Sequence, residues 1–291
     1  MSETRRLLQP SIAFRDAAFD TAHCEKFCLV LQAAGDTLTL AVLDNLSNDF
    51  LAFEQYVFRK VNSEVLFAEQ LSKLINEHEW LTGGFKRVDA MVVTERFTLV
   101  PSALYDSAKA GEYLRFNQPV TAQDFVLNDM LRNAEARLIY AVNAELEKTL
   151  RKISNSVRIR HHLTPLIERN LSVNKNKTAR RAFAHVQQGR FDLLVTEGGK
   201  LLLANSFNFQ APEDFIYFLL YTCEQLKLNP EEAEVEIAGE IATDSAIAAL
   251  AKKYIRHVKF ASYPVEARFS KDFSQFPSHF HYDLFALHFY S

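Results

Sequence analysis

Glycine is scarce in this chain, with 8 glycines among 291 residues. Loops that wrap phosphate groups with backbone N–H groups depend on glycine, because the backbone must approach the ligand closely. The sequence contains no G-x-G-x-x-G, P-loop, G-x-S-x-G or H-E-x-x-H pattern. Local signatures of dinucleotide binding, P-loop nucleotide hydrolysis, serine hydrolysis and zinc-dependent proteolysis are therefore missing.

Cysteine and long apolar runs are also scarce. The cysteines Cys24, Cys28 and Cys223 are odd in number and match no disulfide framework, so we expect buried free thiols in a reducing compartment. No uninterrupted apolar run approaches the length of about 18 residues that predicts a membrane span. The first 20 residues lack the apolar core of a signal peptide, and we expect a cytoplasmic protein.

The chain has no strong excess of charge of either sign. Its formal net charge is −3, which argues against general binding to nucleic acid, and 48% hydrophobic residues allow a large core. One short basic run contains Lys175, Lys177, Arg180 and Arg181. Because no aromatic residues interrupt this run, a solvated linker is the better reading, and contact with RNA ranks last among its functions.

Three consecutive predicted strands organise the first half of the chain. They cover Phe27–Gln32, Thr37–Leu43 and Phe50–Phe58, and the first of them is apolar on both alternating faces. A strand of that kind is covered on both sides. A helical pattern begins at Ser63, and a fourth strand over Val88–Val93 should run parallel to the first through a βαβ crossover.

The same order of elements returns about 150 residues later. Predicted strands over Ala182–Gln187, Phe191–Thr196 and Leu201–Phe209 precede a helix that begins after Pro212. Gly198 and Gly199 favour a tight hairpin, because glycine accepts the positive φ that such turns need. The repeat is one of element order and spacing, and it indicates a duplicated α/β unit.

The boundary between the two units is predicted in the polar, aperiodic stretch Ser172–Arg181. We therefore expect a first unit over 1–173 and a second over 174–291. A strand pair near 124–142 is expected as an insertion in the first unit. Residues 1–26 are mixed and polar, and they should cover the first strand or extend its sheet.

Several segments resemble one uncharacterised bacterial family with the duplicated actin-like ATPase fold. They are Phe191–Val195, the Gly198–Leu202 hairpin with Asn205–Phe207 beyond it, Ala238–Ile241 and Tyr282–Phe285. The resemblance implies an α/β protein with two ribonuclease-H-like lobes, each a mixed five-stranded sheet with flanking helices. The assembly proteins of type IV pili and type II secretion offer a looser architectural analogy.

The actin-like ATPases place an aspartate near the end of the first strand and small residues in the hairpins, where phosphates and Mg²⁺ bind. Here the first strand ends without an acid, Arg190 follows the glycine of the second hairpin, and Gly239 is a single glycine. These departures argue against ATP hydrolysis and predict no resident cofactor and no metal. Residues that could still face a ligand in the cleft are Asp36, Thr37, Gly189, Gly198 and Gly239.

The sequence thus favours a non-catalytic actin-like binding or assembly protein with an unidentified protein partner. The alternative is a divergent ATP-binding phosphotransferase or ATPase that uses the interlobe cleft with Mg²⁺. A nuclease is rejected, because neither first strand carries a carboxylate for two-metal catalysis. The third strand of each unit should be an edge strand, and its aromatic residues Phe53, Phe207 and Phe209 are candidates for partner contact.

Overall fold

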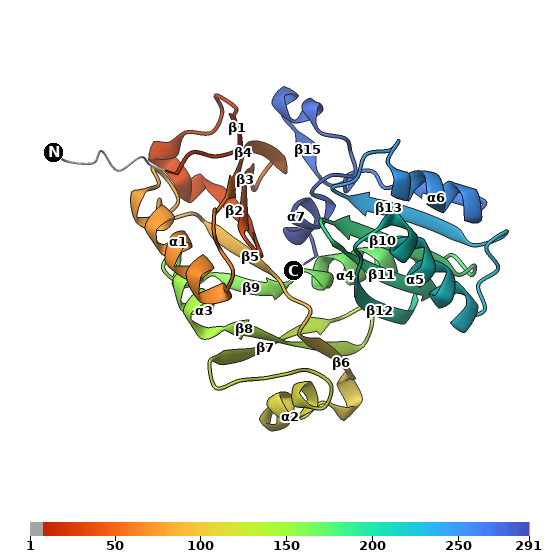
Figure 1. Ribbon diagram of the computed structural model, residues 1–291. Helices are drawn as coiled ribbons and strands as arrows, with labels where there is room; N and C mark the ends of the chain where they lie inside the picture. Colours follow the sequence, from red (N-terminus) through yellow and green to blue (C-terminus); the bar gives the residue numbers. More distant parts are fainter. Residues whose placement is uncertain (1–7, 291) are drawn as a thin grey trace.

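The structure is a computed structural model that describes residues 8–290. Two α/β lobes lie side by side, and a smaller sheet extends from the first lobe (Figure 1). The two-lobed α/β architecture confirms the fold class predicted from the order of elements.

The first lobe is built on the predicted three-strand meander. Its core strands are β2 (Phe27–Ala34), β3 (Thr37–Asp44), β4 (Asp49–Val57), β5 (Arg87–Val93) and β9 (Arg158–His161). The first three are antiparallel neighbours, whereas β5 pairs parallel with β2 and β9 pairs parallel with β5. The predicted parallel crossover is therefore confirmed.

The predicted open edge at β4 is wrong. Strand β1 (Ile12–Arg15) pairs antiparallel with β4, and β15 (Arg268–Phe269) pairs parallel with another part of it. The first sheet therefore has seven strands rather than five. Neither added strand carries a clear local signal, since one lies in a polar stretch and the other has two residues.

Helices cover one face of the first sheet. Helix α1 (Glu64–Glu77) begins after Ser63, whose side chain caps the helix by accepting a hydrogen bond from the Leu66 amide at 3.3 Å. It packs beside α3 (Ala144–Leu150), and a 3-10 helix over Thr21–Lys26 adds the buried Cys24 to the same core.

The second lobe repeats the design with one five-stranded sheet. Its strands, in spatial order, are β12 (Lys200–Asn208), β11 (Arg190–Glu197), β10 (Arg181–Gln187), β13 (Glu234–Gly239) and β14 (His257–Phe260). Helices α5 (Pro212–Gln225) and α6 (Ala246–Tyr254) lie on the outer side. Helix α4 (Leu163–Asn174) packs against β11 and β12 from the inner side.

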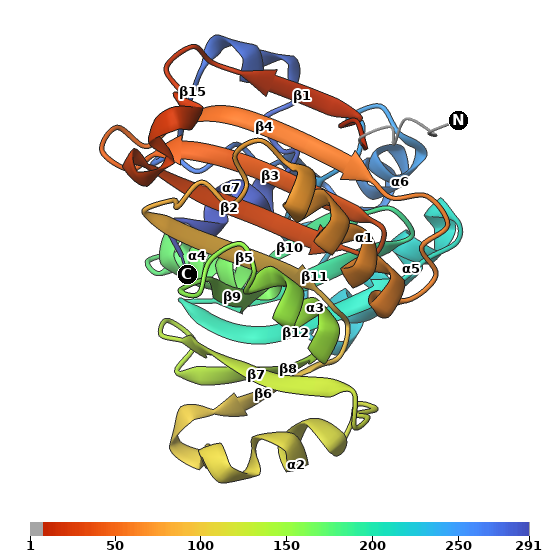
Figure 2. The same ribbon diagram turned by 90° about the vertical axis from the view of Figure 1, so that its left-hand side faces the viewer.

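The predicted strand pair near 124–142 belongs to a small three-stranded sheet. Strands β7 (Asp124–Leu131) and β8 (Ala136–Asn143) form the hairpin, and β6 (Phe97–Pro101) pairs with the other side of β8. Two 3-10 turns over Ser102–Leu104 and Ser107–Lys109 lead into α2 (Ala110–Arg115), which packs on this sheet (Figure 2).

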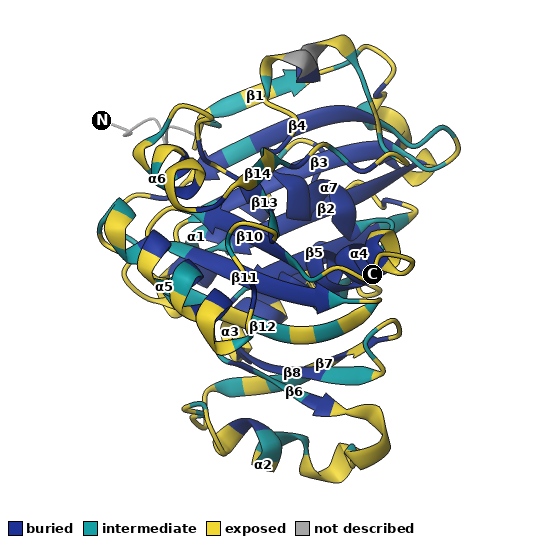
Figure 3. Cartoon of the chain, turned by 90° about the vertical axis from the view of Figure 1, so that its right-hand side faces the viewer, coloured by how far each residue is buried: buried dark blue, intermediate teal, exposed yellow. Residues whose placement is uncertain are grey.

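The end of the chain lies between the lobes. After a 3-10 helix over Lys271–Gln275, helix α7 (Tyr282–Leu287) contacts β2 and β5 of the first lobe and β13 of the second. Every residue of α7 is buried, as its dark ribbon shows (Figure 3). The C-terminal segment of the second unit therefore packs on both lobes.

Candidate functional site

A buried carboxylate from α7 connects the first strands of the two lobes. Asp283 accepts a hydrogen bond at 2.7 Å from Nε2 of Gln32, which lies on β2. Its other oxygen lies 3.5 Å from Nε2 of His185, which lies on β10. Asp283 thus stands between the two strands that, in the resembling ATPases, lead to the phosphate site.

A second buried carboxylate, Asp192, lies on β11 beside this bridge. It accepts hydrogen bonds from Ser206 Oγ at 2.6 Å and from Arg190 Nη2 at 2.7 Å. Nε2 of His162 lies 3.1 Å from Asp192 and 2.7 Å from Arg190 Nη2. Nδ1 of His185 lies 3.7 Å from Asp192, so this histidine stands between two carboxylates.

The charges in this interlobe network balance one another. Burial opposes the positive form of His185, but Asp283 and Asp192 raise its pKa to about 9. Burial likewise opposes both carboxylates, yet the cationic neighbours hold the pKa of Asp192 and of Asp283 below the usual value. Burial lowers the pKa of His162, although Asp192 opposes this shift, and its Nε2 lies within hydrogen-bond distance of both Asp192 and Arg190. Two cations therefore face two anions.

The network offers little to a reacting substrate. The four residues His162, His185, Asp192 and Asp283 are each at most 1% exposed. Asp192 Oδ1 and Asp283 Oδ2 accept hydrogen bonds, whereas Asp192 Oδ2 and both ring nitrogens of His185 form ionic contacts of 3.5–3.7 Å without a hydrogen bond. No thiol or free hydroxyl stands among these residues as a nucleophile. Among the described residues, no group of three or more histidine, cysteine, aspartate or glutamate side chains is placed to hold a metal ion. The arrangement is suited to fixing the lobes together.

Asp36 lies exposed in the turn between β2 and β3, and the half-buried Thr37 begins β3. The Thr37 hydroxyl donates to the Asp36 carboxylate at 3.0 Å, and the Asp36 carbonyl accepts from the Phe58 amide at 2.8 Å. These contacts are internal to the meander, and they stabilise its first turn.

Gly239 ends β13 and is required by chain packing. Its φ is +101°, and a Cβ atom there would lie 2.0 Å from the carbonyl oxygen of Val186. Its amide donates to the His279 carbonyl at 2.8 Å, which ties the C-terminal segment to the second sheet. The glycine therefore allows two chain segments to approach closely.

Gly189 and Gly198 lie at opposite ends of β11. Gly189 is in the turn that follows β10, near Gly239, because Val186 pairs with Gly239 across β10 and β13. Gly198 is in the turn before β12, where its amide donates to the Lys177 carbonyl at 3.1 Å. The structure therefore brings Gly189 and Gly239 together and leaves Gly198 at the far end of β11.

The aromatic candidates also differ in position. Phe53 is fully buried, with ring centroids 5.4 Å from Phe14 and 5.0 Å from Phe276, so the expectation that it lies on an open edge is wrong. Phe207 and Phe209 are half-buried and turn toward α5. Strand β12 itself pairs only with β11 among the described strands, which confirms the predicted edge in the second lobe.

Local sequence patterns did not predict the network, because its carboxylates do not lie on the first strands. Asp192 comes from β11, the strand after β10, and Asp283 comes from α7, which is distant in sequence from both first strands. One local signal was present. Asp192 interrupts the apolar run Phe191–Val195, and Asp283 stands among Tyr282, Leu284 and Phe285. A charged residue inside an apolar run predicts a buried partner.

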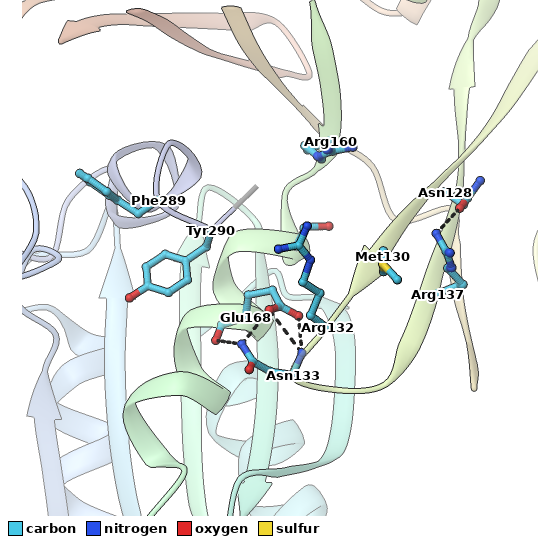
Figure 4. Close-up of a pocket in the computed structure, with 10 residues that line it drawn as sticks. Asn128, Met130, Arg132, Asn133, Arg137, Arg160, Glu168, Phe289 and Tyr290 are labelled. Atoms are coloured by element: carbon cyan, nitrogen blue, oxygen red, sulfur yellow. Dashed lines mark hydrogen bonds between the residues drawn. The ribbon is translucent and has the colours of Figure 1, made fainter. Parts of the chain in front are cut away.

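Away from the cleft, a pocket of about 470 Å³ lies between the small sheet, α4 and the end of the chain (Figure 4). Its lining comprises Asn128, Met130, Arg132, Asn133, Arg137, Arg160, Thr164, Glu168, Phe289 and Tyr290. Three arginines and one glutamate give this lining a positive balance.

Residues 8–290 include no helix long and apolar enough to cross a membrane.

Comparisons with known proteins agree with the fold. A family model described as "Protein of unknown function (DUF3822)" matches residues 16–258. A crystal structure of a Bacteroides thetaiotaomicron protein with actin-like ATPase fold and unknown function is 22% identical, with a TM-score of 0.78, and the match covers 92% of this chain and 98% of that one. A chain of the PilM–PilN type IV pilus biogenesis complex is 12% identical, with a TM-score of 0.52 and coverage of 84% and 91%. No curated protein sequence matches.

Proposed function

The chain belongs to this family of unknown function with an actin-like ATPase fold, and we propose that it is a non-catalytic module that binds or assembles with a protein partner. One observation carries the proposal. The centre of the interlobe region contains a buried network in which two cations face two anions. A nucleotide would have to displace Asp283 and leave buried cations without partners, which is costly.

The C-terminal segment further supports a binding role without catalysis. Strand β15 pairs with β4 of the first lobe, while the His279 carbonyl accepts from Gly239 of the second. Enzymes that bind ligand between two lobes rely on opening and closing of the cleft. Here one segment is attached to both lobes, and this favours a fixed relation between them.

Strand β12 is the surface that best suits a protein partner. It is an edge strand, and its outward residues Leu202 and Asn205 are exposed. An extended segment of a partner can add to such an edge by main-chain hydrogen bonds. The fold similarity to a chain of the PilM–PilN complex supports the idea that this architecture can serve in assembly.

The alternative is a divergent ATP-binding phosphotransferase or ATPase that uses the cleft. Its support is the shared fold alone. Asp36, Thr37, Gly189, Gly198 and Gly239 would be its first residues to test, but their separation weakens the case for one nucleotide site. A cytoplasmic location stays a prediction that cell fractionation can check.

Thermal denaturation with and without Mg²⁺-ATP separates the two functions. We expect no rise in melting temperature, because a ligand that binds the folded state must stabilise it and none is expected to bind. A rise of several degrees that Asp36→Ala abolishes would favour the alternative.

Affinity capture tests the partner surface. We expect a specific protein to be recovered with the wild-type chain and lost with Asn205→Lys, which places a charge on the β12 edge. Leu46→Lys is the matched control, since Leu46 is 89% exposed in the turn before β4 of the first lobe. Equal recovery with both variants would exclude the β12 edge as the contact.

A further inference from the structure

Three guanidinium groups from separate parts of the chain line the pocket beside the small sheet. Arg132 comes from the turn between β7 and β8, Arg137 from β8 and Arg160 from β9. Figure 4 shows Arg132 and Arg160 on the same side of the cavity, between Tyr290 and Met130. In a chain of net charge −3, such a convergence concentrates positive charge in one place.

The one carboxylate in the lining already accepts hydrogen bonds from the protein. Glu168 accepts hydrogen bonds from the Asn133 amide at 3.1 Å and from Asn133 Nδ2 at 2.7 Å. Burial raises the pKa of Glu168, although these hydrogen bonds oppose the shift. Glu168 therefore holds the β7–β8 turn against α4 and offsets part of the charge of Arg132, which leaves the lining with an excess of positive charge.

The arginines keep most of their donors available. Arg137 Nη1 donates to Asn128 Oδ1 at 3.4 Å, and Arg160 Nη1 lies 3.4 Å from Asp129 Oδ1, both at the long end of the hydrogen-bond range. Within the described part of the chain, the guanidinium of Arg132 forms no side-chain hydrogen bond or close ion pair, and Glu168 is its charged neighbour. Each guanidinium has five N–H donors, so the pocket can supply many to a ligand.

Apolar side chains flank the arginines on two sides of the pocket. Met130 is 53% exposed on β7. On the other side, the Tyr290 hydroxyl is held by Glu266 at 2.9 Å and by Arg169 at 3.2 Å. These contacts fix the position of the tyrosine ring, whose face can then contact the body of a ligand.

We propose that this pocket binds a small organic anion, in which a phosphate or carboxylate group is carried on an apolar or aromatic body. The anionic group lies between Arg132 and Arg160, because a guanidinium matches phosphate and carboxylate oxygens with two parallel hydrogen bonds. The body lies between Met130 and Tyr290. A volume of about 470 Å³ falls within the range of about 300–1,000 Å³ that is usual for small-molecule pockets.

This site is separate from the interlobe network and from the β12 edge. It therefore does not depend on the proposed partner binding, and a failure of either proposal leaves the other intact. Phosphate and carboxylate share the same recognition by arginine, so probes of both kinds are needed to tell them apart.

Melting temperatures with phenyl phosphate, phenylacetate, inorganic phosphate and sodium chloride at equal ionic strength test the proposal. At concentrations far above the dissociation constant, we expect phenyl phosphate or phenylacetate to raise the melting temperature by about 2–4 °C. Inorganic phosphate should raise it less, because it lacks the apolar body, and sodium chloride should not raise it. If neither aromatic probe exceeds sodium chloride, the proposal is wrong.

Variants locate the binding. Arg132→Ala removes an exposed guanidinium, and Met130→Glu places a negative charge in the pocket at an exposed position, so both should fold and lose the shift. Met130→Leu should keep the shift. Arg256→Ala should also keep it, since Arg256 lies at the surface near Glu231, away from the pocket. A shift that survives in Arg132→Ala and Met130→Glu, or disappears in Arg256→Ala, would place the anion elsewhere and overturn the proposal.

Discussion

In the first lobe, the third strand of the meander pairs along its outer side with β1 and β15, whereas the equivalent β12 of the second lobe has β11 as its one partner among the described strands. The burial of the two strands follows this difference. Strand β4 has an almost continuous buried run, and β12 alternates between exposed and half-buried residues (Figure 3). The third strand of the duplicated unit is therefore largely buried in the first lobe and partly exposed at the surface in the second.

The covering of β4 comes from segments near the two ends of the chain. Phe14 near the start and Phe273 near the end meet on the inner face of the first sheet, with ring centroids 4.3 Å apart. The packing of the first lobe therefore depends on both of these segments. The second lobe completes its core with its own α5 and α6.

The first strands of the two units differ in a similar way. Gln32 of β2 is neutral, and His185 of β10 is cationic, but both contact Asp283 of α7. A polar residue at matching places in the repeat allows one carboxylate to join the lobes. The variants below test these differences, from the largest expected effect to the smallest.

Phe53→Lys and Phe207→Lys compare the third strands directly. Phe53 is fully buried, so a lysine there should lower the free energy of unfolding by about 5 kcal/mol or abolish folding. Phe207 is half-buried and its lysine head can reach water, so the cost should be about 1–2 kcal/mol. Urea denaturation measures both. Similar losses would contradict the difference in burial between β4 and β12.

Asp283→Ala removes the carboxylate that joins the lobes. We expect a loss of about 3–5 kcal/mol, because His185 would keep a buried charge with weaker compensation. Asp36→Asn changes an exposed carboxylate in the β2–β3 turn and should cost about 0.5 kcal/mol or less. Denaturant midpoints of the two variants provide the comparison, and a small effect of Asp283→Ala would argue against the bridging role.

The stability of the wild-type chain should fall as pH rises from about 6.5 to about 9. The pKa of His185 is raised to about 9 in the folded state, so its protonation stabilises the fold fully below the ordinary value of about 6.5. That contribution, on the order of 3 kcal/mol for a pKa that rises from about 6.5 to about 9, is lost as pH rises through the folded-state value. His185→Gln introduces the residue type of Gln32, the first-lobe residue that contacts Asp283. This variant should show a smaller loss of stability over the same pH range. An unchanged slope in the variant would assign the pH dependence to other groups.

Gly239→Ala and Gly189→Ala should differ by about 1 kcal/mol in unfolding free energy. Both glycines have positive φ, which costs an alanine about 1–2 kcal/mol. At Gly239 the new Cβ would also collide with the Val186 carbonyl, whereas at Gly189 the nearest atom is 4.0 Å away. Thermal or urea unfolding of the pair checks this. Equal losses would show that backbone strain alone makes Gly239 necessary.

Local sequence patterns predict only part of the candidate site, because its main contacts join residues that are distant in sequence. The turn of Asp36 and the position of Gly239 at the end of β13 follow from strand and turn signals, and the structure has them there. Gln32 and His185 share the partner Asp283, which comes from α7 and lies 251 residues after Gln32. A side-chain contact over that separation has no signature in any local window.

The sequence by itself determined the two meanders, their parallel crossovers and the small hairpin, because apolar periodicity and turn residues encode short-range structure. The tertiary structure alone decided which edge stays open and what occupies the space between the lobes. A polar stretch and a two-residue strand cover β4, while Asp283 of α7 contacts both Gln32 of the first lobe and His185 of the second. Such pairings depend on the energy of desolvating and matching distant groups, which is defined only in the folded chain.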